Sequence, residues 1–71
     1  MREVIVRYKP AGSRKWGEYR VQSEGLFEVL GLALEMVNGW LASTRGMATL
    51  EWDQLGSRQR VEVRWKGEEE G

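Results

Sequence analysis

The stretch "SEGLFEVLGLALEMVNGWLASTRG" (residues 23–46) determines the fold, because it interrupts an otherwise alternating chain with helical periodicity. Its apolar residues recur at the three- and four-residue spacing that places them on one side of an α-helix. Ser23 is predicted to be the N-cap, since its hydroxyl can accept a hydrogen bond from a free backbone amide. Gly46, which follows Arg45, is predicted to be the C-terminal cap, since glycine adopts left-handed backbone angles without strain.

The apolar arc of this predicted helix is wider than one core face requires. It covers about 180°, against the roughly 100° typical of a helix that packs on a single layer. The two flanks of the arc consist of Phe27, Leu34 and Leu41 on one side, which recur every seven residues, and Val29, Met36 and Trp40 on the other. A seven-residue repeat is typical of a helix–helix seam, so we expect one flank to form a symmetric homodimer interface. The alternative is a strongly curled sheet in which Trp52 and Trp65 cover the flanks.

Four segments outside the helix alternate apolar and polar residues, as half-buried strands do. The side chains expected to point inward are Val4, Val6, Tyr8, Tyr19, Val21, Ala48, Leu50, Trp52, Val61, Val63 and Trp65. Pro10, Gly12 and Gly17 are turn residues between the first two segments, and Gly56 and Ser57 are turn residues between the last two.

The predicted fold class is therefore α+β, with the element order ββαββ. A helix of this length returns the chain to the far end of the sheet, so the third strand runs antiparallel to the first. We expect a single four-stranded antiparallel sheet in the order 2-1-3-4, with one long helix on its apolar face. Residues 1–66 are predicted to form one domain, and residues 67–71 an acidic, flexible tail.

Composition argues against catalysis and against bound cofactors. The 71-residue chain has no cysteine and no histidine, so thiolate nucleophiles, cysteine or histidine metal ligands and a histidine base are all missing. Gly12 to Gly17 has the glycine spacing of a phosphate loop, but Glu18 stands where that loop needs lysine. Glu51 and Glu62 could form a carboxylate pair, although ion pairing with neighbouring arginines is the favoured interpretation. We predict that the protein is not an enzyme and has no cofactor or metal.

The sequence favours a cytoplasmic location. The N-terminal "MREVIVRYK" (residues 1–9) lacks the apolar core of a signal peptide. The apolar run at residues 26–42 is broken by Glu28, Glu35 and Asn38, so we expect no membrane segment. The absence of cysteine suits a reducing compartment.

A basic loop, "KPAGSRKWGEYR" (residues 9–20), is the candidate nucleic-acid site. Its Gly-Ser-Arg recurs in the second turn at residues 56–58, which raises the alternatives of an internal duplication and of convergent turn chemistry. The candidate contacts are Lys9, Arg14, Lys15 and Trp16 in the first loop and Arg58 and Arg60 in the second. Cations beside an aromatic ring can bind phosphates and stack a base. The alternative is a solvated turn with Trp16 folded back onto the sheet edge.

Net charge gives the nucleic-acid hypothesis little support. Eleven basic residues balance eleven acidic residues, and only the removal of the three tail glutamates leaves the remainder at +3. The first hypothesis is therefore a small, non-catalytic, homodimeric accessory protein that binds a protein partner through its loops or by strand addition at a sheet edge. The alternative is weak, sequence-nonspecific nucleic-acid binding through the basic Gly-Ser-Arg loops.

Overall fold

The computed structural model describes residues 1–64, which form four strands and one helix in the predicted order. The elements are β1 (Arg2–Lys9), β2 (Gly17–Ser23), α1 (Leu26–Thr44), β3 (Met47–Gln54) and β4 (Ser57–Arg64). The predicted inward side chain of Trp65 and the predicted acidic tail lie outside the described residues.

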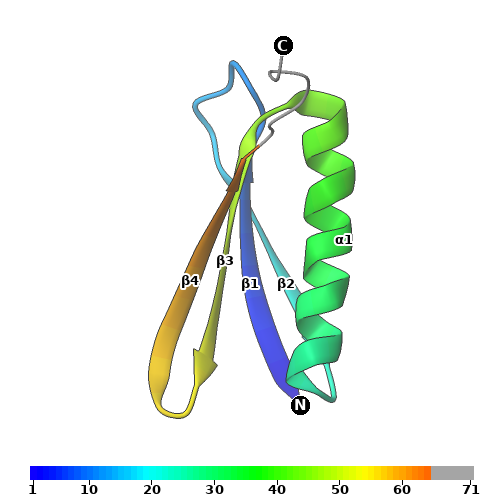
Figure 1. The fold of residues 1–71 in the computed structure, drawn as a ribbon. Helices are drawn as coiled ribbons and strands as arrows, with labels where there is room; N and C mark the ends of the chain where they lie inside the picture. The colour runs from blue at the N-terminus through cyan, green and yellow to red at the C-terminus, as the bar shows by residue number, and fades with distance from the viewer. Residues whose placement is uncertain (65–71) are drawn as a thin grey trace.

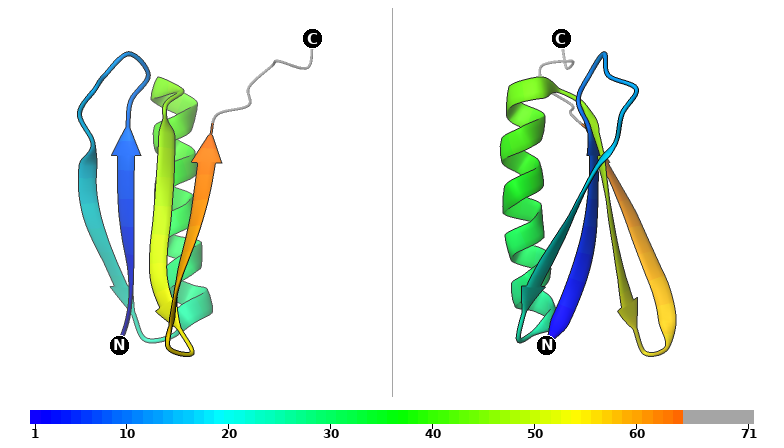
Figure 2. Two further views of the ribbon diagram at one scale, coloured as in Figure 1. Left: turned by 90° about the vertical axis from the view of Figure 1, so that its left-hand side faces the viewer. Right: turned by 180° about the vertical axis from the view of Figure 1, so that it is seen from behind.

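The sheet is fully antiparallel and has the predicted order β2-β1-β3-β4. All strands lie in one layer and α1 covers one side of it, where it contacts β1, β2 and β3 (Figure 1). The other side of the sheet, called the open face below, has no element over it within residues 1–64 (Figure 2). The two central strands, β1 and β3, supply most of the sheet's share of the core.

A narrow stripe of the helix makes the core. The helix residues that are fully buried, Val29, Ala33, Val37 and Leu41, follow one another at intervals of four. They pack with the sheet residues Val4, Val6, Tyr8, Ala48 and Leu50. Small and β-branched side chains on both layers let the helix lie close to the central strands. This stripe spans about 120° of the predicted 180° arc, and Phe27 and Leu34 lie outside it.

Both predicted helix caps are wrong. Ser23 is the last residue of β2 and pairs with Arg2, so its backbone belongs to the sheet, and Gly25 is the N-cap. Arg45, and not Gly46, takes the left-handed conformation, with φ of 58° and an N–H that donates to the Leu41 carbonyl. Gly46 is required for a different reason, since a Cβ there would overlap the Lys9 carbonyl oxygen and the backbone of Pro10.

The β3–β4 hairpin diverges from the helix toward its turn (Figure 1, Figure 2). Val61 pairs with Leu50 and points to the helix side as predicted, yet it is 45% exposed because the helix does not cover that part of the hairpin. Tyr19, also predicted to be inward, is 46% exposed on the edge strand β2, where its ring packs on Trp40 at 4.8 Å.

The two Gly-Ser-Arg segments differ in structure. In the second hairpin, Leu55 and Gly56 form a two-residue turn with φ of 52° and 80°, and Ser57 already belongs to β4. In the first hairpin, Gly12 also has a positive φ, of 82°, but it lies inside a longer loop at residues 10–16. The shared requirement is a left-handed glycine, which supports convergence on turn chemistry.

We predict opposite effects of adding one methyl group at two glycines. Gly46→Ala should lower the free energy of unfolding by about 2 kcal/mol or more, because the new Cβ meets backbone atoms that cannot rotate away. Gly39→Ala on the exposed side of α1 has open space around it, so it should raise stability by up to about 1 kcal/mol. Urea unfolding followed by circular dichroism measures both, and equal effects would contradict the close approach at Gly46.

Tyr8 should make stability depend on alkaline pH. Burial raises the pKa of its phenol, and the neighbouring Tyr19 raises it further, while the hydroxyl donates a hydrogen bond to the Trp40 carbonyl at 3.3 Å. The folded state therefore holds this proton more tightly than the unfolded state, so stability falls as pH rises above about 10, the ordinary tyrosine value. Urea unfolding of the Tyr8→Phe variant should show a shallower loss between about pH 9 and 11. A loss equal to that of the parent protein would contradict this assignment.

Candidate functional site

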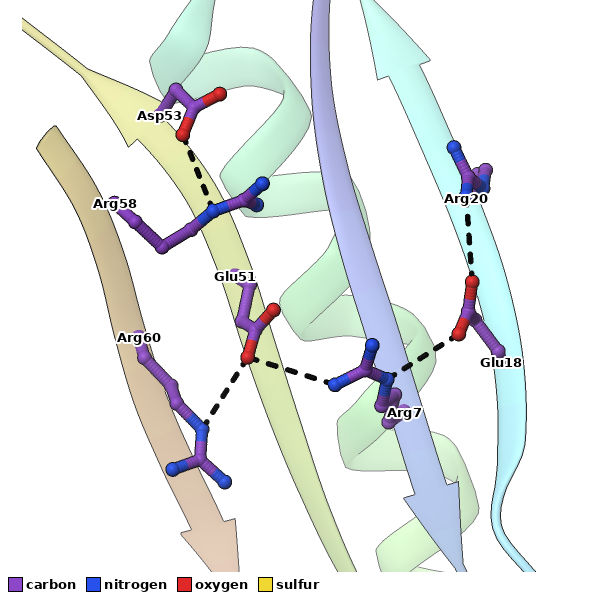
Figure 3. A network of polar contacts seen from close by, with 7 residues as sticks. All are labelled: Arg7, Glu18, Arg20, Glu51, Asp53, Arg58 and Arg60. Atoms are coloured by element: carbon purple, nitrogen blue, oxygen red, sulfur yellow. Dashed lines mark hydrogen bonds and ion pairs between the residues drawn. The ribbon is translucent and has the colours of Figure 1, made fainter. Parts of the chain in front are cut away.

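A chain of ion pairs crosses the open face from one edge of the sheet to the other (Figure 3). The contacts that form it are Arg20–Glu18 at 3.5 Å, Arg7–Glu18 at 3.3 Å, Arg7–Glu51 at 3.7 Å and Arg60–Glu51 at 3.5 Å. These charges alternate in sign across all four strands, as cross-strand pairs do when they stabilise a solvated face. Each exposed pair contributes only about 0.2–1 kcal/mol, but together they neutralise the face.

The ion pairs also account for the carboxylates and cations that the sequence suggested as site residues. Glu51 lies between Arg7 and Arg60, so it is a surface ion-pair partner. Arg58, in the second Gly-Ser-Arg segment, pairs with Asp53 at 3.2 Å. Within residues 1–64, no group of three or more side chains could hold a metal ion.

Several cations belong to the chain segments that meet at the end of the sheet opposite the β3–β4 turn, which is the upper end in Figure 1. β1, β4 and α1 all end there, and the long loop between β1 and β2 projects there. This region, called the basic end below, therefore comprises Lys9, Arg14, Lys15, Arg45 and Arg64. Lys9, Arg45 and Arg64 help to line a shallow hollow of about 300 Å³ at this end. The six candidate nucleic-acid residues are therefore divided, with Arg58 beside the β3–β4 turn and Arg60 farther along β4, where it borders a hollow with Trp16.

Trp16 lies against the open face, whereas the alternative interpretation of the basic loop placed it on the sheet edge. The Lys9 ammonium sits 5.6 Å from the centre of its ring, and the side chain is 46% exposed. Trp16 also borders a hollow of about 420 Å³ with Arg7, Thr49 and Arg60. Both of those arginines are already paired with Glu51, which limits what the hollow can offer an anion.

An apolar groove lies between the helix and the diverging hairpin. Its lining residues, all apolar, are Leu30, Leu34, Leu50, Trp52 and Val61, and it has a volume of about 140 Å³. Phe27 stands on the same flank of α1 as Leu34, two turns toward the N-terminus, and is 88% exposed. The groove and Phe27 together are called the apolar surface below.

The six candidate dimer residues are divided by this packing. Val29 and Leu41 are buried core residues, at 0% and 4% exposure, so they are removed from the candidate interface. Trp40 packs on Tyr8, with ring centres 5.0 Å apart, and on Tyr19, so the flank that also includes Met36 is covered by β2. Phe27 and Leu34, at 88% and 41%, form the exposed flank.

Leu30, Trp52 and Val61 were not among the predicted interaction residues. Trp52 and Val61 were predicted to lie inward, and they do face the helix side, yet the β3–β4 hairpin to which they belong diverges from α1 (Figure 1). The one signal was the excess width of the apolar arc, which exceeded what a single face could cover.

The length and apolar composition of α1 raise the question of whether it could span a membrane. It has 19 residues, and an 18-residue window within it has a mean hydropathy of 1.3, enough by length and composition to cross a membrane. A core helix meets the same criterion, and the buried stripe of α1 packs on the sheet. Helix composition is thus weak evidence for a membrane segment.

Comparison of the chain with protein-family models, with curated proteins and with solved structures gives no match. Functional inference consequently depends on the surfaces described above.

Proposed function

We propose that the protein is a small, non-catalytic interaction protein that binds an apolar protein surface through its apolar surface. The observation that carries this proposal is the groove lined entirely by apolar side chains, beside a phenylalanine that is 88% exposed. Single exposed apolar residues are ordinary, but an aromatic ring next to an apolar hollow is typical of an interaction site.

The groove also indicates the chemistry of its occupant. A hollow without polar lining offers no hydrogen bond to a polar ligand, so it discriminates by shape and by apolar burial. Burial of apolar area contributes about 25 cal/mol per Å², and an inserted aromatic or leucine side chain would remove both itself and the groove from water. The expected partner therefore presents a protruding apolar side chain, as the central contacts of protein interfaces commonly do.

The open face is a weaker candidate for partner binding. Its arginines and carboxylates are mutually paired, and a partner would have to replace those pairs with contacts of its own. Binding at the apolar surface breaks no ion pair and removes only contact with water.

Site-specific photo-crosslinking tests this proposal with two adjacent positions. A photoreactive phenylalanine analogue at Val61 lies in the groove, whereas the same analogue at Glu62 lies on the open face of the same strand. We expect a discrete protein adduct from position 61 in cells that produce the protein, none from position 62, and loss of the adduct when Leu34→Asp is added.

Two results would contradict the proposal. The first is the absence of any discrete adduct from position 61, and the second is equal adducts from both positions. A thermal melt of each labelled protein confirms that the domain remains folded, since Val61 is 45% exposed and Leu34 is 41% exposed.

The basic end supports a second candidate function, weak binding of nucleic-acid phosphates. Five cations from three separate chain segments gather at one end, and Arg14 and Lys15 in the loop are exposed. Such a cluster attracts a phosphate backbone without reading its sequence.

A matched pair of double variants tests this second function. Arg14→Ala with Lys15→Ala should reduce the slope of log affinity against log salt by up to about 2 for single-stranded DNA and RNA, measured by fluorescence anisotropy. Arg58→Ala with Arg60→Ala should change the slope less, because these two cations are already paired with Asp53 and Glu51. Equal reductions, or no binding by the parent protein at low salt, would remove the basic end from consideration.

A further inference from the structure

We infer that the occupant of the apolar groove is a second copy of this chain, in a dimer whose α1 helices cross antiparallel and exchange Phe27. This inference rests on the proposed function, since it names the partner of the same surface. In it, the Phe27 ring of each subunit enters the groove of the other.

The first support is that the apolar surface is self-complementary, because it includes both a protruding ring and a hollow that could hold one. Phe27 protrudes from the helix flank with 88% of its surface exposed, although the same helix buries four smaller residues completely. The neighbouring groove has a volume of about 140 Å³, comparable to the apolar cavities of about 150 Å³ that admit a benzene ring. A twofold interface requires one patch to complement itself, and a ring beside a ring-sized hollow does so.

The second support is the spacing of residues along α1. At about 100° per residue, Phe27, Gly31, Leu34 and Asn38 fall within a strip about 60° wide. A twofold axis midway between Leu30 and Gly31 sets Phe27 of one helix opposite Leu34 of the other. The same axis brings Gly31 of one helix beside Gly31 of the other, so neither backbone carries a side chain at the crossing.

Gly31 otherwise lacks a structural purpose in the subunit. It costs the helix up to about 1 kcal/mol relative to alanine, and a Cβ added there would meet no atom within 4 Å. Its backbone conformation is helical, so no positive φ requires glycine. A close approach of another helix gives this glycine a role, because two backbones can pack closely where one lacks a side chain.

Charges do not oppose the antiparallel crossing. The strip itself carries none, and Glu28 and Glu35 lie about 60° and 40° around the helix from Gly31, on the side of the strip away from the core. The glutamates of the two copies therefore lie toward solvent, where screening weakens their repulsion. With one aromatic ring and a few aliphatic side chains from each copy, we expect a dimer of roughly micromolar affinity.

Sedimentation equilibrium over micromolar to millimolar concentrations tests the dimer. We expect the wild-type protein to move from one to two chain masses as concentration rises. Phe27→Ala should weaken the dimer by at least about a hundredfold, since two rings are lost from each dimer. The fold of the subunit should survive, because Phe27 makes little contact within it.

Two glycines of the same helix give the matched control. Both have open space for a Cβ, but Gly31 lies on the proposed crossing, whereas Gly39 lies about 80° around α1 and about 12 Å along it from that point. Gly31→Ala should weaken the dimer by about tenfold or more, while Gly39→Ala leaves its affinity unchanged. Both should stabilise the isolated subunit, which separates an interface effect from a folding effect.

Because the chain has no cysteine, disulfide trapping gives a direct geometric test. Gly31→Cys should form a covalent dimer on mild oxidation, since the axis brings the two copies of this position together, and Gly39→Cys should not. A wild-type protein that stays monomeric to millimolar concentration, or a dimer unaffected by both Phe27→Ala and Gly31→Ala, would overturn the inference. A monomer that still gives a position-61 adduct with another protein would leave the proposed function standing, whereas the lack of any adduct from position 61, with a second copy or with another protein, would remove both.

Discussion

The packing of one narrow helix stripe on two central strands is the constraint from which the rest of the structure follows. Val29, Ala33 and Val37 have small or branched side chains, so α1 lies close to β1 and fills the space there without longer residues. A straight helix that is seated closely on β1 cannot also follow β4, because the twist of the sheet turns the outer strands away. The diverging hairpin and its uncovered inner face are the geometric result (Figure 1).

As a result of this packing, the charged side chains on one side of the sheet are paired, whereas some apolar side chains on the other side are not covered. On the open face, each carboxylate of the ion-pair chain already has a cationic partner within the same chain, so these carboxylates require no partner from another molecule. On the inner side of the hairpin, Trp52 and Val61 are apolar side chains of a two-layer fold that lacks a second layer at that point. Under the proposed function, the hydrophobic effect would act there without specificity, and the hollow and the protruding ring would supply the specificity.

The sequence predicts the architecture well, because alternation and helical periodicity are local signals. It could not predict the helix caps, since the use of Ser23 is determined by its pairing with Arg2 across the sheet. Gly46 has the composition of a left-handed cap, but its role depends on the approach of Lys9, a residue 37 positions away in the chain. The exposure of Val61 depends on sheet twist, which a period-two pattern does not contain. The excess width of the apolar arc correctly indicated uncovered apolar surface, and only the packing identified which flank was uncovered.

The side chains of the edge strand β4 affect which mode of partner binding is favourable. Strand addition needs an accessible edge, and β4 carries Arg58, Arg60 and Arg64 on the open face along that edge. Charged side chains along an edge oppose pairing with another strand, because pairing would crowd and partly desolvate them. The opposite side of the same strand is apolar at Val61 and Val63. The β4 edge thus disfavours contact through its backbone, whereas its inner face favours apolar contact. For the proposed function, docking of a helix or a protruding side chain is therefore preferred to strand addition, which the sequence also allowed.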